Sequence, residues 1–126
     1  MPRVVHFEIP AHDPGKIAAF YKEIFGWEIN KYDGGGEPYW LVKTGEQGTP
    51  GIDGGVFRPR GPLTGVINTV DVQDIDALLT KVKANGGQVI VEKGAVAGVG
   101  WLAYCKDVEG TIFGMMQMDP NAGTGQ

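Results

Sequence analysis

Apolar and polar residues alternate along the first strand-like segment of the chain, residues 3–10. Val5, Phe7 and Ile9 fall on one side of such a strand, and His6 and Glu8 fall on the other, because successive strand side chains point to opposite faces. One face is therefore expected to meet a core. The other face carries an imidazole and a carboxylate, which are candidates for a binding or catalytic site.

A helical pattern follows this strand. Asp13 suits an N-cap and Pro14 the first helical position, and Gly26 suits the left-handed residue that ends many helices. Between them, apolar residues recur at the spacing of a helix that packs along one side, namely Ile17, Phe20, Tyr21 and Ile24. Three strands are then expected, over about 27–32, 38–44 and 52–58.

The second half of the chain repeats this pattern at an offset of 61 residues. Residues 7–29 lie over residues 68–90 without a gap, and Trp40 lies over Trp101 at the same offset. The second copy predicts a strand over 64–71, then a helix that ends at Asn85-Gly86-Gly87, and three more strands over 87–92, 99–105 and 111–118. The apolar stripe of this helix is Ile75, Leu78, Leu79 and Val82.

The expected fold is therefore α+β, with two βαβββ modules at about 3–58 and 64–118. Together they form one domain, residues 1–118, followed by a flexible tail at 119–126. A helix covers only one face of a four-stranded sheet, so the other face must be buried. Two such sheets facing each other, or facing a partner subunit, would form a cupped, half-barrel mixed sheet with helices outside.

Composition narrows the class of protein. The 126 residues are 42% hydrophobic, carry a net charge of −4, and include a single cysteine, Cys105. The basic residues are scattered along the chain, which argues against nucleic-acid binding. A single cysteine excludes a disulfide within the chain. No apolar run is long enough to span a membrane, and no signal-peptide pattern opens the sequence. We expect a cytoplasmic protein.

Two segments carry a family resemblance: "VVHFEIPAHDPGKIAAFYKEIFGWEI" near the start, and "NGGQVIVEKGAVAGVGWLAYCKDVEGTIFGMMQ" near the end. They resemble the vicinal oxygen chelate superfamily, which includes glyoxalase I, bleomycin-resistance proteins and extradiol dioxygenases. The resemblance covers residues 4–118 and implies paired βαβββ modules, in agreement with the repeat.

The resemblance also implies where a metal would lie in members that use one. Each module supplies a ligand from its first and its last strand, and the four matching positions are His6, Gly55, Ile67 and Gly114, with Val66 in place of Ile67 if the register slips by one residue. Only His6 can ligate a metal through its side chain, and a catalytic site needs three or four donors. We therefore predict no cofactor and no classical glyoxalase I reaction, with a divalent metal held by His6 and Glu8 left as the alternative.

Without a metal, the two glycines would leave room for a ligand in an apolar cavity. The candidate ligand-binding residues are His6, Glu8, Gly55, Asn68, Trp101 and Gly114, and the candidate catalytic residues are His6 and Glu8. Trp101 and Trp40 are alternatively a matched pair of core residues.

The function that follows is binding of a small organic molecule by a glyoxalase-like or bleomycin-resistance-like protein, here with an incomplete metal site. It could act as a lyase or isomerase on a small metabolite. The alternative is a resistance-type protein that sequesters a drug or metabolite without turnover. A homodimer is expected from the size and the open sheet. The substrate cannot be named from the sequence.

Overall fold

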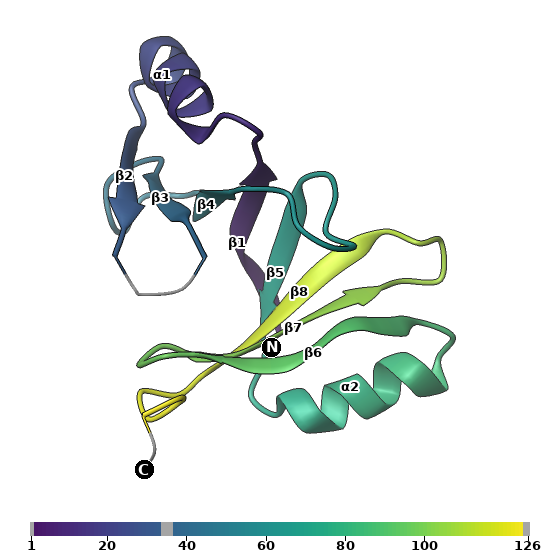
Figure 1. Ribbon diagram of the computed structural model, residues 1–126. Coiled ribbons are helices and arrows are strands. Elements are labelled where there is room, and N and C mark those ends of the chain that lie inside the picture. Colours follow the sequence, from purple (N-terminus) through teal and green to yellow (C-terminus); the bar gives the residue numbers. More distant parts are fainter. Residues whose placement is uncertain (1, 34–36, 125–126) are drawn as a thin grey trace. The chain divides into compact units, whose positions relative to one another are not determined.

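The computed structural model describes residues 2–33 and 37–124, and in them the strands and helices follow the order that the repeat predicts (Figure 1). The elements are β1 (Arg3–Pro10), α1 (Pro14–Phe25), β2 (Glu28–Tyr32), β3 (Tyr39–Lys43), β4 (Asp53–Phe57), β5 (Ile67–Asp71), α2 (Ile75–Ala84), β6 (Gln88–Val96), β7 (Gly100–Lys106) and β8 (Ile112–Met118). No helix in these residues is long and apolar enough to cross a bilayer.

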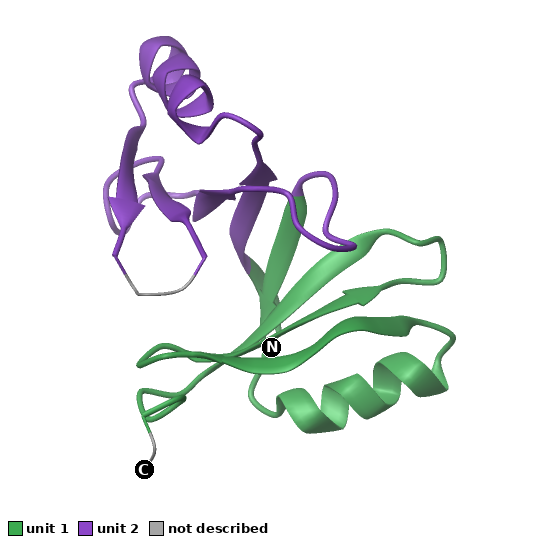
Figure 2. Ribbon diagram, in the orientation of Figure 1, with its two compact units in different colours: residues 1–4, 67–126 green, residues 5–66 purple. Residues whose placement is uncertain are grey.

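The chain divides into two compact units (Figure 2). The N-terminal module comprises residues 5–66, and the C-terminal module comprises residues 67–126 with residues 1–4. Strands run in the order β2-β3-β4-β1 in the first and β5-β8-β7-β6 in the second. In each module the first and last strands pair in parallel, and the other pairs are antiparallel. The α+β class with two βαβββ modules is confirmed, and the joining of the modules into one cup stays a prediction.

Helix α1 begins and ends as its sequence predicts. The Asp13 carboxylate accepts a hydrogen bond from the Lys16 backbone N–H at 3.1 Å, with Pro14 in the first turn. Gly26 is left-handed at φ 73°, and its N–H donates to the Lys22 carbonyl at 2.8 Å. A glycine is needed here because a side chain would strain this conformation.

The core of the N-terminal module lies between α1 and one face of the sheet. Ala11, Val42 and Val56 are buried in it. Packed against them are Phe7, Ile9, Ile17, Trp27, Ile29 and Trp40. The alternation along β1 is confirmed for Phe7 and Ile9, which face the core, while His6 and Glu8 occupy the opposite face. Val5, expected on the core side as well, is 44% exposed.

The predicted apolar stripe of α1 is only half correct. Ile17 packs on the core and Tyr21 stacks on Trp27, with ring centroids 5.2 Å apart. Phe20 and Ile24, however, are 57% and 56% exposed. The helix turns Pro14, Ile17 and Tyr21 toward the sheet, and residues 20 and 24 lie to one side of that line.

The C-terminal module repeats this arrangement with a more complete helix contact. The Asp74 carboxylate caps α2 by accepting from the Ala77 N–H at 3.1 Å. Ile75 and Leu79 are buried against the sheet, in a core with Val72, Ala103, Cys105 and Met115. Strand β6 runs to Val96, beyond the predicted end at residue 92, because "GAV" continues the pairing with β7.

Residues 119–124 form a hydrogen-bonded turn where the composition predicts a flexible tail. The carbonyl of Ala122 accepts from the Gly98 N–H at 2.9 Å, and Ala122 is fully buried. The Asp119 carboxylate also accepts from the Trp101 indole N–H at 3.1 Å. These contacts anchor the segment to the β6–β7 hairpin, and residues 125–126 lie outside the described part of the chain.

Close packing at Gly54 gives a prediction about stability. A Cβ built on Gly54 would overlap the backbone oxygen and the ring of Phe7, whereas one on Gly94 would meet nothing within 4 Å. Neither residue has the positive φ that disfavours a side chain. We expect Gly54→Ala to lower the free energy of unfolding by about 1–3 kcal/mol or more, and Gly94→Ala to change it by less than about 0.5 kcal/mol.

Urea unfolding followed by circular dichroism would measure both variants. Equal midpoints for the two would show that the close approach of β1 and β4 at Gly54 is wrong.

Candidate functional site

The candidate site lies on the face of the N-terminal sheet opposite α1, here called the helix-free face. The pairing of β1 with β4 sets His6 beside Asp53 and Glu8 beside Gly55. The pairing of β3 with β4 sets Leu41 on the other side of Gly55. Because paired residues share a face, the helix-free face carries a row of Leu41, Gly55 and Glu8, with His6 one step along β1.

A hydrogen bond joins His6 to Tyr39 across this face. The Nε2 atom of His6 lies 2.7 Å from the Tyr39 hydroxyl oxygen. The two rings are nearly parallel, with an interplanar angle of 14° and centroids 6.4 Å apart. Tyr39 comes from β3 and His6 from β1, and β4 runs between them. The phenol therefore crosses a whole strand to reach the imidazole.

Gly55 is the residue that the phenol crosses. A Cβ built on Gly55 would overlap the hydroxyl and the ring of Tyr39. The prediction that Gly55 leaves empty room for a ligand is therefore wrong in one respect, since Tyr39 fills the space above it. The consequence is a polar pair, phenol and imidazole, at a position where the resemblance implies a metal ligand.

Burial and nearby charges act on His6 in opposite directions. Burial lowers the pKa of the imidazole below its usual 6.5, and this is the largest effect. The carboxylates of Glu8 and Asp53 raise the pKa, but they do not offset the burial. His6 is therefore neutral at pH 7, with one ring nitrogen protonated and the other an acceptor. A neutral imidazole beside a hydroxyl can take up or pass on a proton.

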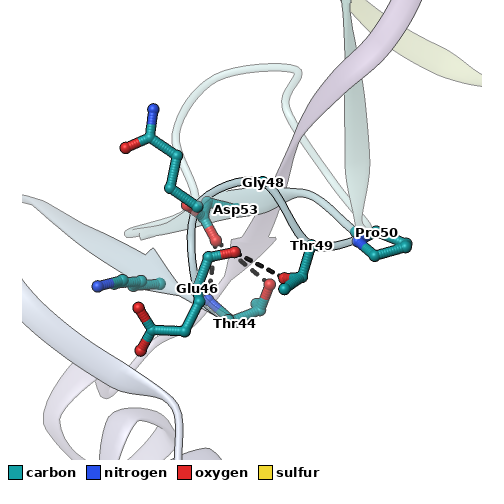
Figure 3. Close-up of a pocket in the computed structure, with 10 residues that line it drawn as sticks. Thr44, Glu46, Gly48, Thr49, Pro50 and Asp53 are labelled. Atoms are coloured by element: carbon teal, nitrogen blue, oxygen red, sulfur yellow. Dashed lines mark hydrogen bonds between the residues drawn. The ribbon is translucent and has the colours of Figure 1, made fainter.

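Asp53 is held in place by the loop between β3 and β4. Its carboxylate accepts from the Thr44 N–H at 2.8 Å and from the Thr44 hydroxyl at 3.2 Å (Figure 3). Within the same loop, the Thr49 hydroxyl donates to the Glu46 carbonyl at 2.6 Å. The loop encloses a shallow polar pocket, but these hydroxyl groups serve the loop itself. What this loop contributes to the candidate site is the Asp53 carboxylate, which it holds beside His6.

The C-terminal module places different chemistry at the matching positions. Gly114 pairs with Thr69 just as Gly55 pairs with Glu8, so the two glycines are equivalent. A Cβ on Gly114 would meet the Thr69 hydroxyl at 3.0 Å and the Tyr104 ring at 3.4 Å. Ile67, which matches His6 in the repeat, is fully buried. The titratable pair of the first module has no counterpart at these positions.

Asn68 and Trp101 lie away from Gly114. Asn68 pairs with Phe113, on the face that packs against α2, and Trp101 packs against the same core. Lys93 lies over the Trp101 ring, 5.1 Å from its centroid. Trp40 packs on the α1 side of its own module. Structural packing is thus confirmed for both tryptophans, and a ligand contact by Asn68 or Trp101 stays a prediction.

Tyr39 is the site residue that sequence reasoning misses. The motif "PYW" identifies a strand, and the alternation places Tyr39 and Trp40 on opposite faces. With Trp40 in the core, this alternation assigns Tyr39 to the same face as His6. It does not predict the contact between the two side chains, because that contact depends on the register of three strands.

Comparisons with known proteins agree with this architecture. A family model described as bleomycin resistance protein-like N-terminal matches residues 3–38. A curated protein of Mycobacterium bovis and one of Mycobacterium tuberculosis, both named "Putative glyoxylase CFP32", are 31% identical over 118 residues. That alignment covers 90% of this chain and 43% of each relative, so the chain spans less than half of their length.

Solved structures extend the match to the whole fold. A hypothetical protein from Bacillus halodurans superposes with a TM-score of 0.71 at 16% identity, covering 96% of this chain and 97% of that one. Methylmalonyl-CoA epimerase from M. tuberculosis gives a TM-score of 0.65 at 18% identity, covering 93% and 88%. The family model, the curated relatives and the solved structures together support the vicinal oxygen chelate superfamily. At these identities the neighbours establish the fold alone.

The metal that many members of this superfamily use does not fit the residues present. Of the four matching positions, Gly55, Ile67 and Gly114 carry no donor side chain. Within residues 2–33 and 37–124, no three His, Cys, Asp or Glu side chains come together. A divalent catalytic centre needs at least three such donors. His6 is instead engaged by the Tyr39 hydroxyl.

This donor set predicts little stabilisation by metal ions. A site saturated at 100 times its dissociation constant would add about 2.7 kcal/mol to the free energy of unfolding. We expect Ni²⁺, Zn²⁺, Mn²⁺, Fe²⁺ and Co²⁺ to leave the melting temperature of the protein and of His6→Gln equally unchanged. A metal-dependent rise of several degrees that disappears in His6→Gln would show that His6 belongs to a metal centre.

The lowered pKa of His6 predicts a pH dependence of stability. The unfolded chain takes up the His6 proton near pH 6.5, whereas the folded protein takes it up only at lower pH. The contribution of His6 to the free energy of unfolding is therefore fully present above pH 6.5. It is lost as the pH falls toward the pKa of His6 in the folded protein. We expect urea midpoints of the wild type to fall more than those of His6→Gln between pH 7 and pH 5.

Parallel falls in the two proteins would contradict the neutral, buried state of His6. Titration of the imidazole Cε1–H by NMR measures the same pKa directly, with His12→Gln identifying the second histidine signal.

Proposed function

We propose that this protein binds a small organic carbonyl compound on the helix-free face of its N-terminal module and catalyses a proton transfer on it. The reaction class is isomerase or lyase. The observation that carries this proposal is the 2.7 Å contact between the Tyr39 hydroxyl and a neutral His6. Both residues are half-buried, so the pair is shielded from bulk water and still accessible to a ligand.

The proposed step uses the two groups in different roles. The C–H bond next to the substrate carbonyl breaks, and its proton passes to Nε2 of His6. The electron pair moves onto the carbonyl oxygen, and the Tyr39 O–H, released from Nε2, donates a hydrogen bond to the resulting enolate. Return of the proton from Nε2 to the neighbouring carbon completes an isomerisation without an oxidant or a second reactant.

The surroundings of the pair support a small, partly apolar substrate. Leu41 is 47% exposed on the helix-free face beside Gly55, and it offers an apolar contact. Glu8 is buried next to Gly55 and is a second candidate group for moving protons. The curated relatives carry the name putative glyoxylase, which supports an enzyme of this class without naming the substrate.

Sequestration without turnover is the second candidate. The match of residues 3–38 to a bleomycin resistance protein-like model favours it, and the net charge of −4 suits a cationic drug. In this case His6 and Tyr39 would serve only as hydrogen-bonding groups for the bound molecule. The homodimer and cytoplasmic location expected from the sequence fit both candidates.

Deuterium exchange separates the two candidates. A panel of small α-substituted carbonyl acids and thioesters is incubated with protein in D₂O, and NMR measures loss of the C–H signal. We expect at least one compound to exchange, with a rate reduced about 100-fold or more in His6→Gln, since an acid–base group contributes roughly 10²–10⁴-fold. Tyr39→Phe is expected to reduce exchange while leaving His6 in place.

The matched control is His12→Gln, which removes an exposed histidine outside the site. Stoichiometric binding with no exchange would favour sequestration. Exchange that survives in both His6→Gln and Tyr39→Phe would refute the proposed site.

A further inference from the structure

A row of aromatic residues crosses the helix-free face next to the candidate site. The register pairs Tyr32 with Tyr39 and Tyr39 with Phe57, so these three residues, called here the aromatic row, share the face that carries His6. Along β4, Phe57 lies two residues beyond Gly55, a separation of about 6.6 Å. Since the Tyr39 phenol crosses Gly55, the aromatic row lies directly beside the pair formed by Tyr39 and His6.

The side chain of Arg60 lies over one end of the aromatic row. Its Cζ atom is 5.9 Å from the centroid of the Phe57 ring, within the range of a cation–π contact. A turn after β4 holds the backbone of Arg60, because its carbonyl accepts a hydrogen bond from the Leu63 N–H at 3.1 Å. Leu63 itself is buried. The guanidinium therefore has a defined place at the end of the helix-free face, while the residue remains exposed.

No carboxylate neutralises this guanidinium. In the part of the chain that the structure describes, Arg60 contacts the Phe57 ring and forms no ion pair. Lys43, a second cation on the helix-free face, is by contrast paired with Glu28 across β2 and β3. A guanidinium presents several N–H donors in one plane, which match the two oxygens of a carboxylate. Arg60 is thus available to bind an anionic group that comes with a ligand.

Charges on the helix-free face have opposite signs at its two ends. Asp53 pairs with His6, and Glu8 follows His6 on the same side of β1, whereas Arg60 lies at the end of β4. An anionic group is therefore repelled beside His6 and attracted beside Arg60. A molecule with such a group is held in one orientation, with its anionic group and its reactive carbon apart.

We propose that Arg60 determines the specificity of the candidate site and that the substrate is a carbonyl compound with a terminal carboxylate. The guanidinium binds the carboxylate, the aromatic row contacts the chain of the substrate, and the carbonyl group reaches the Tyr39 hydroxyl. Several bonds separate the carboxylate from the reactive carbon, because Phe57 and Gly55 are about 6.6 Å apart. This inference rests on the proposed function and narrows its substrate class to oxo acids.

Matched acids and esters test the charge that Arg60 selects. Linear oxo acids of increasing length and their methyl esters are incubated with protein in D₂O, and NMR measures exchange of the C–H next to the oxo group. We expect the longer acids to have a KM at least about tenfold below that of their esters, since a hydrogen bond to a charged group changes affinity by about that factor or more. Arg60→Gln is expected to raise the KM of the acids about tenfold, with kcat and the KM of the esters unchanged.

Two further arginine variants control this experiment. Arg58→Gln removes the same charge from an exposed residue two positions away, and it is expected to leave every KM unchanged. Arg60→Lys keeps the charge without the planar group, so its KM for the acids is expected between those of the wild type and Arg60→Gln. Circular dichroism verifies that the variants fold. Equal KM values for acid and ester, or an Arg60→Gln that matches the wild type, would overturn the assignment of Arg60 and leave the proposed proton transfer intact.

Direct binding keeps the test independent of turnover. Isothermal titration calorimetry with the same acids measures Kd in the wild type and in Arg60→Gln, whether or not a compound exchanges. An acid that binds about tenfold more weakly to Arg60→Gln, with no exchange of any compound, would support the carboxylate site and contradict the proposed proton transfer. Absence of measurable binding by every acid would overturn the inference.

Discussion

The crossing of the Tyr39 phenol over Gly55 is the constraint on which the candidate site depends. Neighbouring strands lie about 4.8 Å apart, so β3 and β1 are separated by about twice that distance. Only a long side chain lying flat across β4 can connect them. Any Cβ at residue 55 would occupy the place of the phenol. The absence of a side chain at one position therefore permits a hydrogen bond between two strands that do not pair. The same crossing covers the imidazole of His6, and burial is the main reason why its pKa is lowered.

The two modules show how one architecture carries different chemistry. The equivalent pairs Glu8–Gly55 and Thr69–Gly114 keep the same register, so the backbone is conserved between the halves of the chain. What differs is the side chain on the first strand, which is His6 in one module and the buried Ile67 in the other. At this position, therefore, only the N-terminal module carries an imidazole. The C-terminal module instead has the more completely buried helix contact, through Ile75 and Leu79.

Local patterns in the sequence predict most of the fold and only part of the site. The Asp13 cap, the Gly26 end of α1 and the alternation along β1 depend on neighbouring residues alone, and all three are found as expected. The contact of Tyr39 with His6 depends on the register of three strands, which a period of two residues does not specify. Exposure of Phe20 depends on how α1 is rotated over its sheet. The helical period shows which residues share a side, but not how wide the contact with the sheet is.

The sheet of the N-terminal module separates the candidate site from the exposed apolar residues of α1. His6, Tyr39 and Gly55 lie on its helix-free face, while Phe20 and Ile24 lie on the helix that covers the opposite face. Selection for one surface therefore places little restriction on the other, because no side chain of a strand can serve both faces. The matching positions of α2 carry Lys81 and Asn85, which are both exposed, so packing of a module helix on its own sheet does not require apolar side chains there.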